Sequence, residues 1–316
     1  MIRPAVKGRL HPRNRFRDGY DFARLIACSP DLAAYVGPNA YGDASIDYAD
    51  PDAVKALNRA LLTSAYGLTT WDVPPGSLCP PIPGRSDYLH HLADLLAGDT
   101  GGEADRAARI VRVLDVGTGA NCIYPLIGAS EYGWSFVGTE VDPEALRWAT
   151  NLVAANPTVS ALIECRLQVS PLECFSGVVH PGEAFDVTMC NPPFHASAEE
   201  AAEGSRRKRR NLGGKSRPST ALNFGGRASE LWCAGGELGF VRRMILQSAE
   251  RPLLSRWFTS LVSKSAHLPR LLHTLRDVEA VDVRTIDMAH GQKRSRILVW
   301  TFRTSPAPVP RARGRA

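Results

Sequence analysis

The turn Asn191-Pro192-Pro193-Phe194 is the most specific chemical pattern in the chain, and it follows the apolar run at residues 185–190. A proline-rich turn that only ends a strand is the alternative, because proline is common where strands stop. The residue types suit an exocyclic amine on a flat ring. The Asn191 side-chain oxygen and the Pro192 carbonyl offer two rigidly held acceptors for its N–H groups, and Phe194 offers a ring for stacking. We therefore predict that these four residues are catalytic.

A second pattern, Asp-Val-Gly-Thr-Gly at residues 115–119, stands where an apolar run meets a helical segment. Glycines at such a turn let the backbone approach a ligand closely. The same pattern is also compatible with a tight turn that binds no ligand. Cys122 occupies the place of the third glycine in a dinucleotide motif, so an adenosyl cofactor fits better than a dinucleotide. Glu140 ends the next apolar run, where a carboxylate can bind both ribose hydroxyls or remain a solvated acid.

The two patterns together indicate transfer of a methyl group from a sulfonium to an amine, a reaction dominated by positioning. Such chemistry requires no metal. The seven cysteines contain no C-x-x-C pair, which argues against a zinc site and against a disulfide framework. We therefore expect an adenosyl cofactor, no metal and reduced thiols.

From residue 109 onward short apolar runs alternate with helical segments, a pattern typical of a parallel sheet covered on both faces. Two late runs separated only by a polar loop predict a closing antiparallel hairpin at one edge. The expected strands are residues 109–116, 134–140, 161–167, 185–190, 257–262, 281–286 and 296–302, and the expected helices include residues 52–65, 86–96 and 142–155.

Basic residues are concentrated at the N-terminus, in the segment after the catalytic turn and at the C-terminus. With a formal net charge of +6 over 316 residues, the chain is suited to an anionic partner, although solvated tails and loops are the simpler alternative. The residues predicted to contact this anionic partner are Arg13, Arg15, Arg207, Lys208, Arg209 and Arg210. No apolar run approaches the ~20 residues that span a bilayer, so we expect a cytoplasmic protein.

From about Leu10 to Phe302 the chain closely resembles the bacterial RlmF family of 23S ribosomal RNA adenine-N6 methyltransferases. Many separate motifs in one order carry this resemblance. They are LHPRNR at residues 10–15, LCPPIPGR at 78–85, DVGTGANCIYPL at 115–126, CNPPFH at 190–195, RKRRNL at 207–212, ALNFGG at 221–226 and ELWC at 230–233.

The resemblance implies an α/β fold, a seven-stranded Rossmann-like methyltransferase sheet with an N-terminal, mostly helical extension. We expect residues 1–105 to form this extension, which binds RNA and covers the cofactor site. Residues 106–303 would form the methyltransferase domain, and residues 304–316 a basic, disordered tail. The cofactor would be S-adenosylmethionine, bound by Arg85, Asp115, Gly117, Gly119, Asn121, Glu140, Ser170 and Asn191. Among these, Arg85 would contact the methionine carboxylate, Glu140 the ribose, and Ser170 would lie near the adenine.

The resemblance also implies the substrate, N6 of one adenine in 23S ribosomal RNA, either free or in an assembly intermediate of the large subunit, and a monomer is favoured. Two enzymatic alternatives stay open, because the same turn also suits guanine N2 in ribosomal RNA and the side-chain amide of a protein glutamine. A catalytically inactive RNA-binding factor of ribosome assembly is the alternative from another class.

Overall fold

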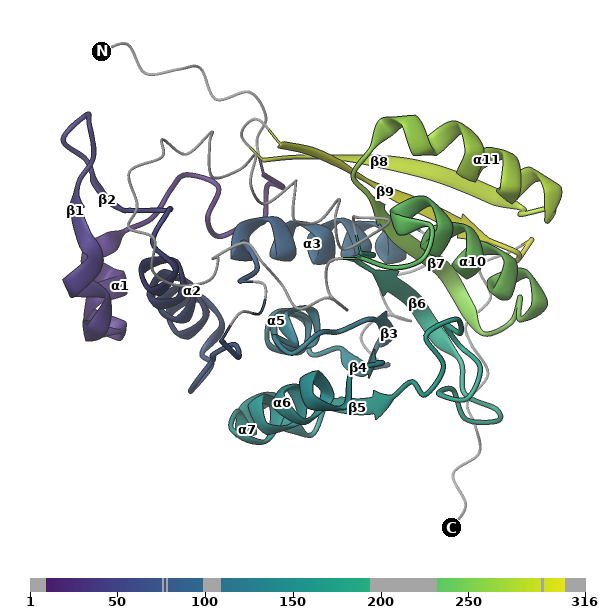
Figure 1. The fold of residues 1–316 in the computed structure, drawn as a ribbon, viewed down its shortest axis with the longest axis horizontal. Coiled ribbons are helices and arrows are strands. Elements are labelled where there is room, and N and C mark those ends of the chain that lie inside the picture. Colours follow the sequence, from purple (N-terminus) through teal and green to yellow (C-terminus); the bar gives the residue numbers. More distant parts are fainter. Residues whose placement is uncertain are drawn as a thin grey trace.

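The computed structural model describes residues 10–75, 77, 79–98, 109–193, 232–290 and 293–304. In this part of the chain the centre of the molecule is a seven-stranded sheet with the strand order β5-β4-β3-β6-β7-β9-β8 (Figure 1). Helices cover both faces of this sheet, so the predicted α/β class is confirmed.

Five strands of the sheet pair in parallel: β3 (Arg112–Val116), β4 (Ser135–Glu140), β5 (Ile163–Leu167), β6 (Phe185–Cys190) and β7 (Ser255–Val262). The last strand, β9 (Lys293–Thr301), runs antiparallel to both β7 and β8 (Asp282–His290). All the predicted strands are present, and the expected hairpin lies at one edge of the sheet.

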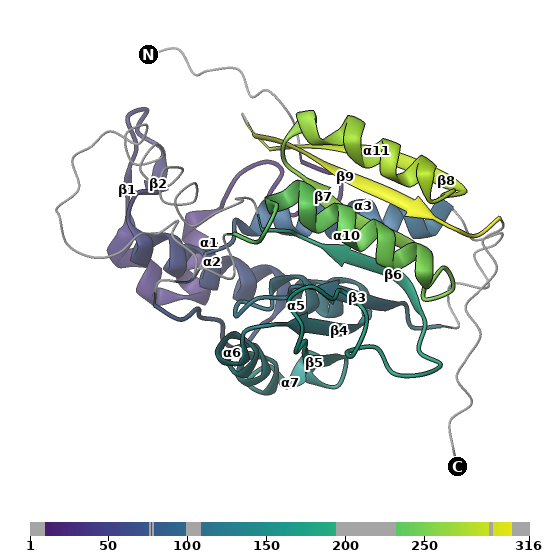
Figure 2. The ribbon, with the colours of Figure 1, turned by 45° about the vertical axis from the view of Figure 1, so that its right-hand side comes forward.

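Along β3, β4, β7 and β9, alternate residues enter two buried clusters, one on each face of the sheet. In β3, Val113 belongs to the cluster under α3 (Ile82–Gly98), α5 (Ile123–Tyr132) and α6 (Pro143–Ala154). The next residue, Leu114, belongs to the cluster under α10 (Gly236–Glu250) and α11 (Leu268–Asp277). Figure 2 shows α10 and α11 lying together along β7 and β9. A short helix, α7 (Pro157–Ser160), follows α6, and a 3-10 helix, η2 (Ser265–His267), precedes α11.

The N-terminal extension is mostly helical, as predicted. It contains α1 (Phe22–Cys28), a 3-10 helix η1 (Pro30–Tyr35), a ribbon of β1 (Val36–Pro38) and β2 (Ala44–Ile46), and α2 (Pro51–Tyr66), and it ends in α3. Buried residues of α2 and α3 share one cluster with α5 and the sheet, so the extension packs directly on the methyltransferase core. The expected limits at residues 105 and 106 lie outside the described residues, as does the tail after Thr304.

Helix α3 begins at Ile82, several residues before the start expected from the proline-rich sequence. Proline is tolerated in a first helical turn, where its missing N–H has no intrahelical partner in any case. Arg85 donates its backbone N–H to Pro81 O at 3.2 Å, so this arginine lies in the first turn of a helix and not after a loop.

Two general properties bear on function. No helix in the described part of the chain is long and apolar enough to cross a membrane. Within the same residues, no group of histidine, cysteine, aspartate and glutamate side chains is arranged to hold a metal ion.

Candidate active site

A pocket lies at the carboxyl edge of the sheet, where the parallel strands β3, β4, β5 and β6 all end. This edge is where open α/β sheets bind ligands. The space between the lining atoms is about 890 Å³, open solvent included. The lining residues are Arg85, Val116, Gly117, Thr118, Gly119, Asn121, Ile123, Tyr124, Thr139, Glu140, Val141, Gln168, Pro171, Glu173, Cys190, Asn191, Pro193 and Phe240.

The turn after β3 is held open by its backbone conformation. Gly117 and Gly119 have φ angles of 79° and 65°, in the left-handed region that favours glycine. The N–H groups of Gly117 and Thr118 both donate to Thr139 O, at 3.0 and 2.8 Å. The turn is thereby fixed to the end of β4, and its glycines expose backbone to the pocket.

Glu140 ends β4 and is 7% exposed. Its Oε2 accepts the N–H of Gly119 at 3.0 Å, and its Oε1 accepts the N–H groups of Val141 and Asp142 at 2.8 and 3.0 Å. These bonds orient the carboxylate beside the glycine turn. Glu140 lines the pocket at the end of its strand, the place where a carboxylate can bind a ribose.

Asp115 lies one residue before the end of β3 and is completely buried. Neither carboxylate oxygen has a hydrogen-bond partner among the described residues. Burial raises the pKa of Asp115 to about 7, and the Thr118 side chain and the positive charge of Arg85 both oppose this shift. Asp115 is not itself among the residues that line the pocket.

Arg85 reaches the pocket from α3 and contacts the catalytic turn directly. Its Nη1 donates to the Tyr124 hydroxyl at 2.7 Å. With the Asn191 carboxamide turned so that its oxygen faces Arg85, this oxygen lies 3.0 Å from Nη1 and 3.2 Å from Nη2. The structure therefore brings together the residue expected to bind the cofactor carboxylate and the residue expected to hold the amine.

The remainder of the catalytic turn continues along the pocket. Asn191 and Pro193 line the pocket, and Pro192 between them is buried. Phe194 lies outside the described residues, so its predicted stacking role stays a prediction.

Two other predicted cofactor residues differ in their placement. Asn121 lines the pocket, and its carbonyl accepts the indole N–H of Trp71 at 3.1 Å, which ties the extension to the glycine turn. Ser170 is not among the lining residues, whereas Gln168 and Pro171 on either side of it are. Gln168 Oε1 accepts the N–H of Ser170 at 3.1 Å, so Ser170 is bonded to a residue that lines the pocket.

The predicted RNA-binding arginines of the N-terminus form ion pairs within the protein. Arg13 contacts Asp94 at 2.6 Å, and Arg15 contacts Glu131 at 2.8 Å. Asp94 lies at the opposite end of α3 from Arg85, about 13 Å along the helix axis. Arg13 is therefore outside the pocket. The other predicted RNA ligands, Arg207, Lys208, Arg209 and Arg210, lie outside the described residues.

Sequence reasoning missed several lining residues, notably Tyr124, Gln168 and Phe240. Tyr124 belongs to an apolar helical segment, where an aromatic residue is normally interpreted as core. Gln168 directly follows β5. Because ligands bind at the carboxyl ends of parallel strands, this position indicates a pocket residue from the sequence. Nothing in the sequence around Phe240 distinguishes it from a core residue of α10.

The pocket residues fit S-adenosylmethionine: left-handed glycines open the backbone, a strand-end glutamate can bind ribose, and a buried arginine can bind a carboxylate. Solved structures support this assignment. The structure described as the human METTL16 catalytic domain with the MAT2A 3'UTR hairpin 1 superposes with a TM-score of 0.79 at 32% identity, covering 96% of this chain and all of that one. The N-terminal domain of human METTL16 in complex with SAH gives a TM-score of 0.71 at 30% identity, over 93% and 99% of the two chains. Fold and site define an S-adenosylmethionine-dependent methyltransferase.

The sequence comparisons narrow this class to one family. A family model described as RNA methyltransferase matches residues 4–304. The ribosomal RNA large subunit methyltransferase F of Yersinia enterocolitica is 53% identical over 95% of this chain and 90% of its own length. The enzyme of the same name from Pectobacterium carotovorum is also 53% identical, over 96% of both chains. The chain belongs to the ribosomal RNA large subunit methyltransferase F family.

Proposed function

We propose that this protein transfers a methyl group from S-adenosylmethionine to the N6 amine of one adenine in large-subunit ribosomal RNA. The contact between Arg85 and Asn191 supports this proposal most directly, because it joins the cofactor residues and the catalytic turn in one pocket. The relatives' name supports the choice of ribosomal RNA, and the METTL16 complexes with RNA hairpins are consistent with an RNA substrate.

Each residue then has a defined role. S-adenosylmethionine supplies a methyl group activated on a sulfonium. Arg85 would bind its carboxylate, and Glu140 would bind its ribose. Asn191 and the Pro192 carbonyl hold the N–H groups of the target amine, and their rigid placement favours the transition state.

The target adenine must leave its helical stack, because a stacked N6 cannot reach the sulfonium. Phe194 would then stack on the extruded base. The RNA backbone would be bound by Arg13 and Arg15 and by the basic segment at residues 207–210. Under this proposal the protein acts as a monomer in the cytoplasm, on free 23S ribosomal RNA or on an assembly intermediate.

The test is mass spectrometry of nucleosides from unmodified large-subunit ribosomal RNA after incubation with the protein and labelled S-adenosylmethionine. We expect labelled N6-methyladenosine at one site. Labelled N2-methylguanosine would agree with the proposed mechanism but would show that the substrate base is guanine and not adenine. Cofactor binding without label in RNA would contradict the proposal and favour a glutamine amide substrate or an inactive assembly factor, and labelling of a protein would distinguish these two.

The variant Asn191→Ala separates binding from chemistry. We expect it to lower turnover by about 100-fold or more, as for the loss of other preorganised transition-state contacts. Its affinity for S-adenosylmethionine, measured by calorimetry, should change by only a few-fold. Equal losses of turnover and cofactor affinity would remove Asn191 from the proposed catalytic role.

A further inference from the structure

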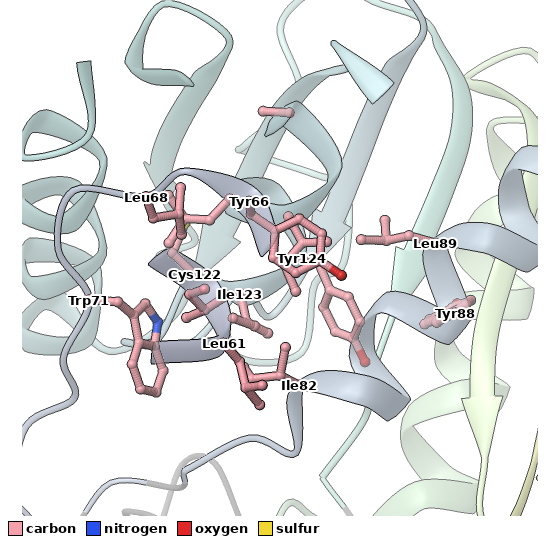
Figure 3. Close-up of a cluster of buried hydrophobic side chains, with 14 of the residues drawn as sticks. Leu61, Tyr66, Leu68, Trp71, Ile82, Tyr88, Leu89, Cys122, Ile123 and Tyr124 are labelled. Carbon is pink, nitrogen blue, oxygen red and sulfur yellow. The ribbon is translucent and has the colours of Figure 1, made fainter. Parts of the chain in front are cut away.

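Tyr124 is a buried polar residue of the pocket that the proposed mechanism does not use. It lies in the first turn of α5, just after the glycine turn, and is 4% exposed. It also lines the pocket, and Figure 3 shows its ring among buried side chains of α2, α3 and α5. Burial raises the pKa of Tyr124 to about 12, so its hydroxyl stays neutral at physiological pH.

Tyr124 contacts Arg85 in two ways. Its hydroxyl accepts a hydrogen bond from Arg85 Nη1 at 2.7 Å, and the guanidinium carbon lies 5.4 Å from the centre of its ring. Arg85 Nε has no hydrogen-bond partner among the described residues. A long arginine side chain loses rotamer entropy when it binds a ligand, so a partner that already fixes its orientation reduces the cost of ligand binding.

The ring of Tyr124 is itself held by a second tyrosine. Tyr88 packs edge-on against it, with the ring centres 5.6 Å apart and the planes at 89°. The Tyr88 hydroxyl bonds to Thr259 Oγ1 at 2.7 Å, and this threonine donates to Thr188 O at 2.7 Å. Tyr124 is therefore fixed through α3 to the central strands β6 and β7.

A neutral hydroxyl is a suitable partner for an arginine that must bind a carboxylate. An aspartate or glutamate in the same place would neutralise the guanidinium and compete with the ligand. The phenol instead orients the guanidinium and leaves its full positive charge available.

We propose that Tyr124 is a positioning residue, which holds Arg85 in the orientation that binds the methionine carboxylate of S-adenosylmethionine. The inference rests on the proposed function, since that function assigns the carboxylate to Arg85. Tyr124 therefore contributes to the affinity for the carboxylate of the cofactor and not to the affinity for its adenosine.

The experiment compares two ligands by calorimetry on the full chain. They are S-adenosylmethionine and its decarboxylated form, which keeps the adenosine, the sulfonium and the amine. The ratio of their dissociation constants measures the carboxylate contact alone. We expect Tyr124→Phe, which keeps the ring, to weaken S-adenosylmethionine by about 3- to 10-fold while the decarboxylated ligand changes less than about twofold.

Tyr132→Phe is the matched control. Tyr132 ends the same helix, its hydroxyl bonds to His90 Nδ1 at 2.6 Å, and its ring lies under the guanidinium of Arg13 at 5.9 Å, outside the pocket. This variant should leave the ligand ratio unchanged. Thermal unfolding of both variants shows whether each is folded at the temperature of the titration.

Arg85→Gln separates the inference from the proposed function. Suppose that Arg85→Gln brings the ratio of the two dissociation constants close to one while Tyr124→Phe leaves it at the wild-type value. In that case the proposed role of Tyr124 is wrong and the role of Arg85 stands. If Arg85→Gln leaves the ratio unchanged, the carboxylate assignment itself fails. Equal weakening of both ligands by Tyr124→Phe would indicate a packing role and overturn the inference.

Discussion

At the scale of single residues, Asp115 carries a feature that sequence alone does not reveal. Its carboxylate is completely buried, without a hydrogen-bond partner among the described residues, and burial raises its pKa to about 7. In an unfolded chain the same group ionises near pH 4. Between about pH 4 and pH 7 the folded protein therefore binds one more proton than the unfolded chain, and its stability falls as the pH rises.

Asp115→Asn removes this titration while keeping the shape of the side chain. We expect the stability of the variant relative to wild type to increase between pH 5 and pH 8, by on the order of 3 kcal/mol, and to level off above pH 8. Urea unfolding without cofactor at several pH values measures this difference. Asp18→Asn, which changes an exposed aspartate, is the control. If the difference in unfolding free energy between Asp115→Asn and wild type does not change with pH, Asp115 is already ionised in the folded protein at pH 5.

At the scale of elements, the N-terminal segment is anchored on α3 by side chains that are far apart in sequence. Asn14 Nδ2 donates to Pro83 O at 2.8 Å and to Asp87 Oδ1 at 3.0 Å, on both sides of Arg85. Arg13 is held by Asp94 and by His90 O, yet its side chain is 46% exposed. The segment thus supports the first turn of α3 while its arginine still faces solvent.

Arg13→Gln and Asp94→Asn break the same ion pair. The first variant leaves the negative aspartate and the second leaves the positive arginine. If Arg13 binds RNA phosphate, as proposed, Arg13→Gln should lower RNA affinity by about 2- to 5-fold at low salt, because one phosphate contact is lost. Asp94→Asn should leave RNA affinity unchanged or raise it, because the arginine is kept and a negative charge is removed. Filter binding at several salt concentrations measures both. Similar affinities for both variants, with similar losses of stability, would make the role of Arg13 purely structural.

The strands could be predicted because buried parallel strands are short, continuous apolar runs that end at motif residues such as Glu140 and Asn191. The two strands of the closing hairpin extend further than expected, since β8 and β9 continue to His290 and from Lys293 through polar residues. Backbone pairing between the two strands continues as far as His290 and Lys293. The start of α3 was missed because Pro81 and Pro83 resemble a loop.

The candidate site divides in the same way. Gly117, Gly119 and Glu140 could be predicted because their spacing along the chain follows from strand, turn and strand. The contacts of Arg85 with Tyr124 and Asn191 join three separate elements, and such a meeting depends on tertiary packing. Ser170 was expected near the cofactor, and only the structure indicates that its neighbour Gln168 lines the pocket.

At the scale of the whole molecule, the extension and the catalytic domain share a buried cluster. Leu61 of α2, Leu89 of α3 and Ile123 of α5 are all buried in this cluster (Figure 3). Changes in the extension should therefore alter the stability of the whole protein. The net charge of +6 gives any RNA a general attraction, so the location of the contacts must be tested by comparing segments of equal charge.

Two triple variants of the chain make this comparison. One carries Arg207→Gln, Arg209→Gln and Arg210→Gln, with Lys208 kept, and the other carries Arg311→Gln, Arg313→Gln and Arg315→Gln. Each removes three positive charges. If the segment at residues 207–210 binds RNA phosphates, the first variant should weaken binding and reduce the slope of log K against log salt by about 2 to 3, since each phosphate contact contributes about 0.7 to 0.9. The tail variant should change the slope by less than about 1. An equal change in both slopes would mean that general charge accounts for the attraction, and an unchanged slope in the first would remove residues 207–210 from the RNA interface.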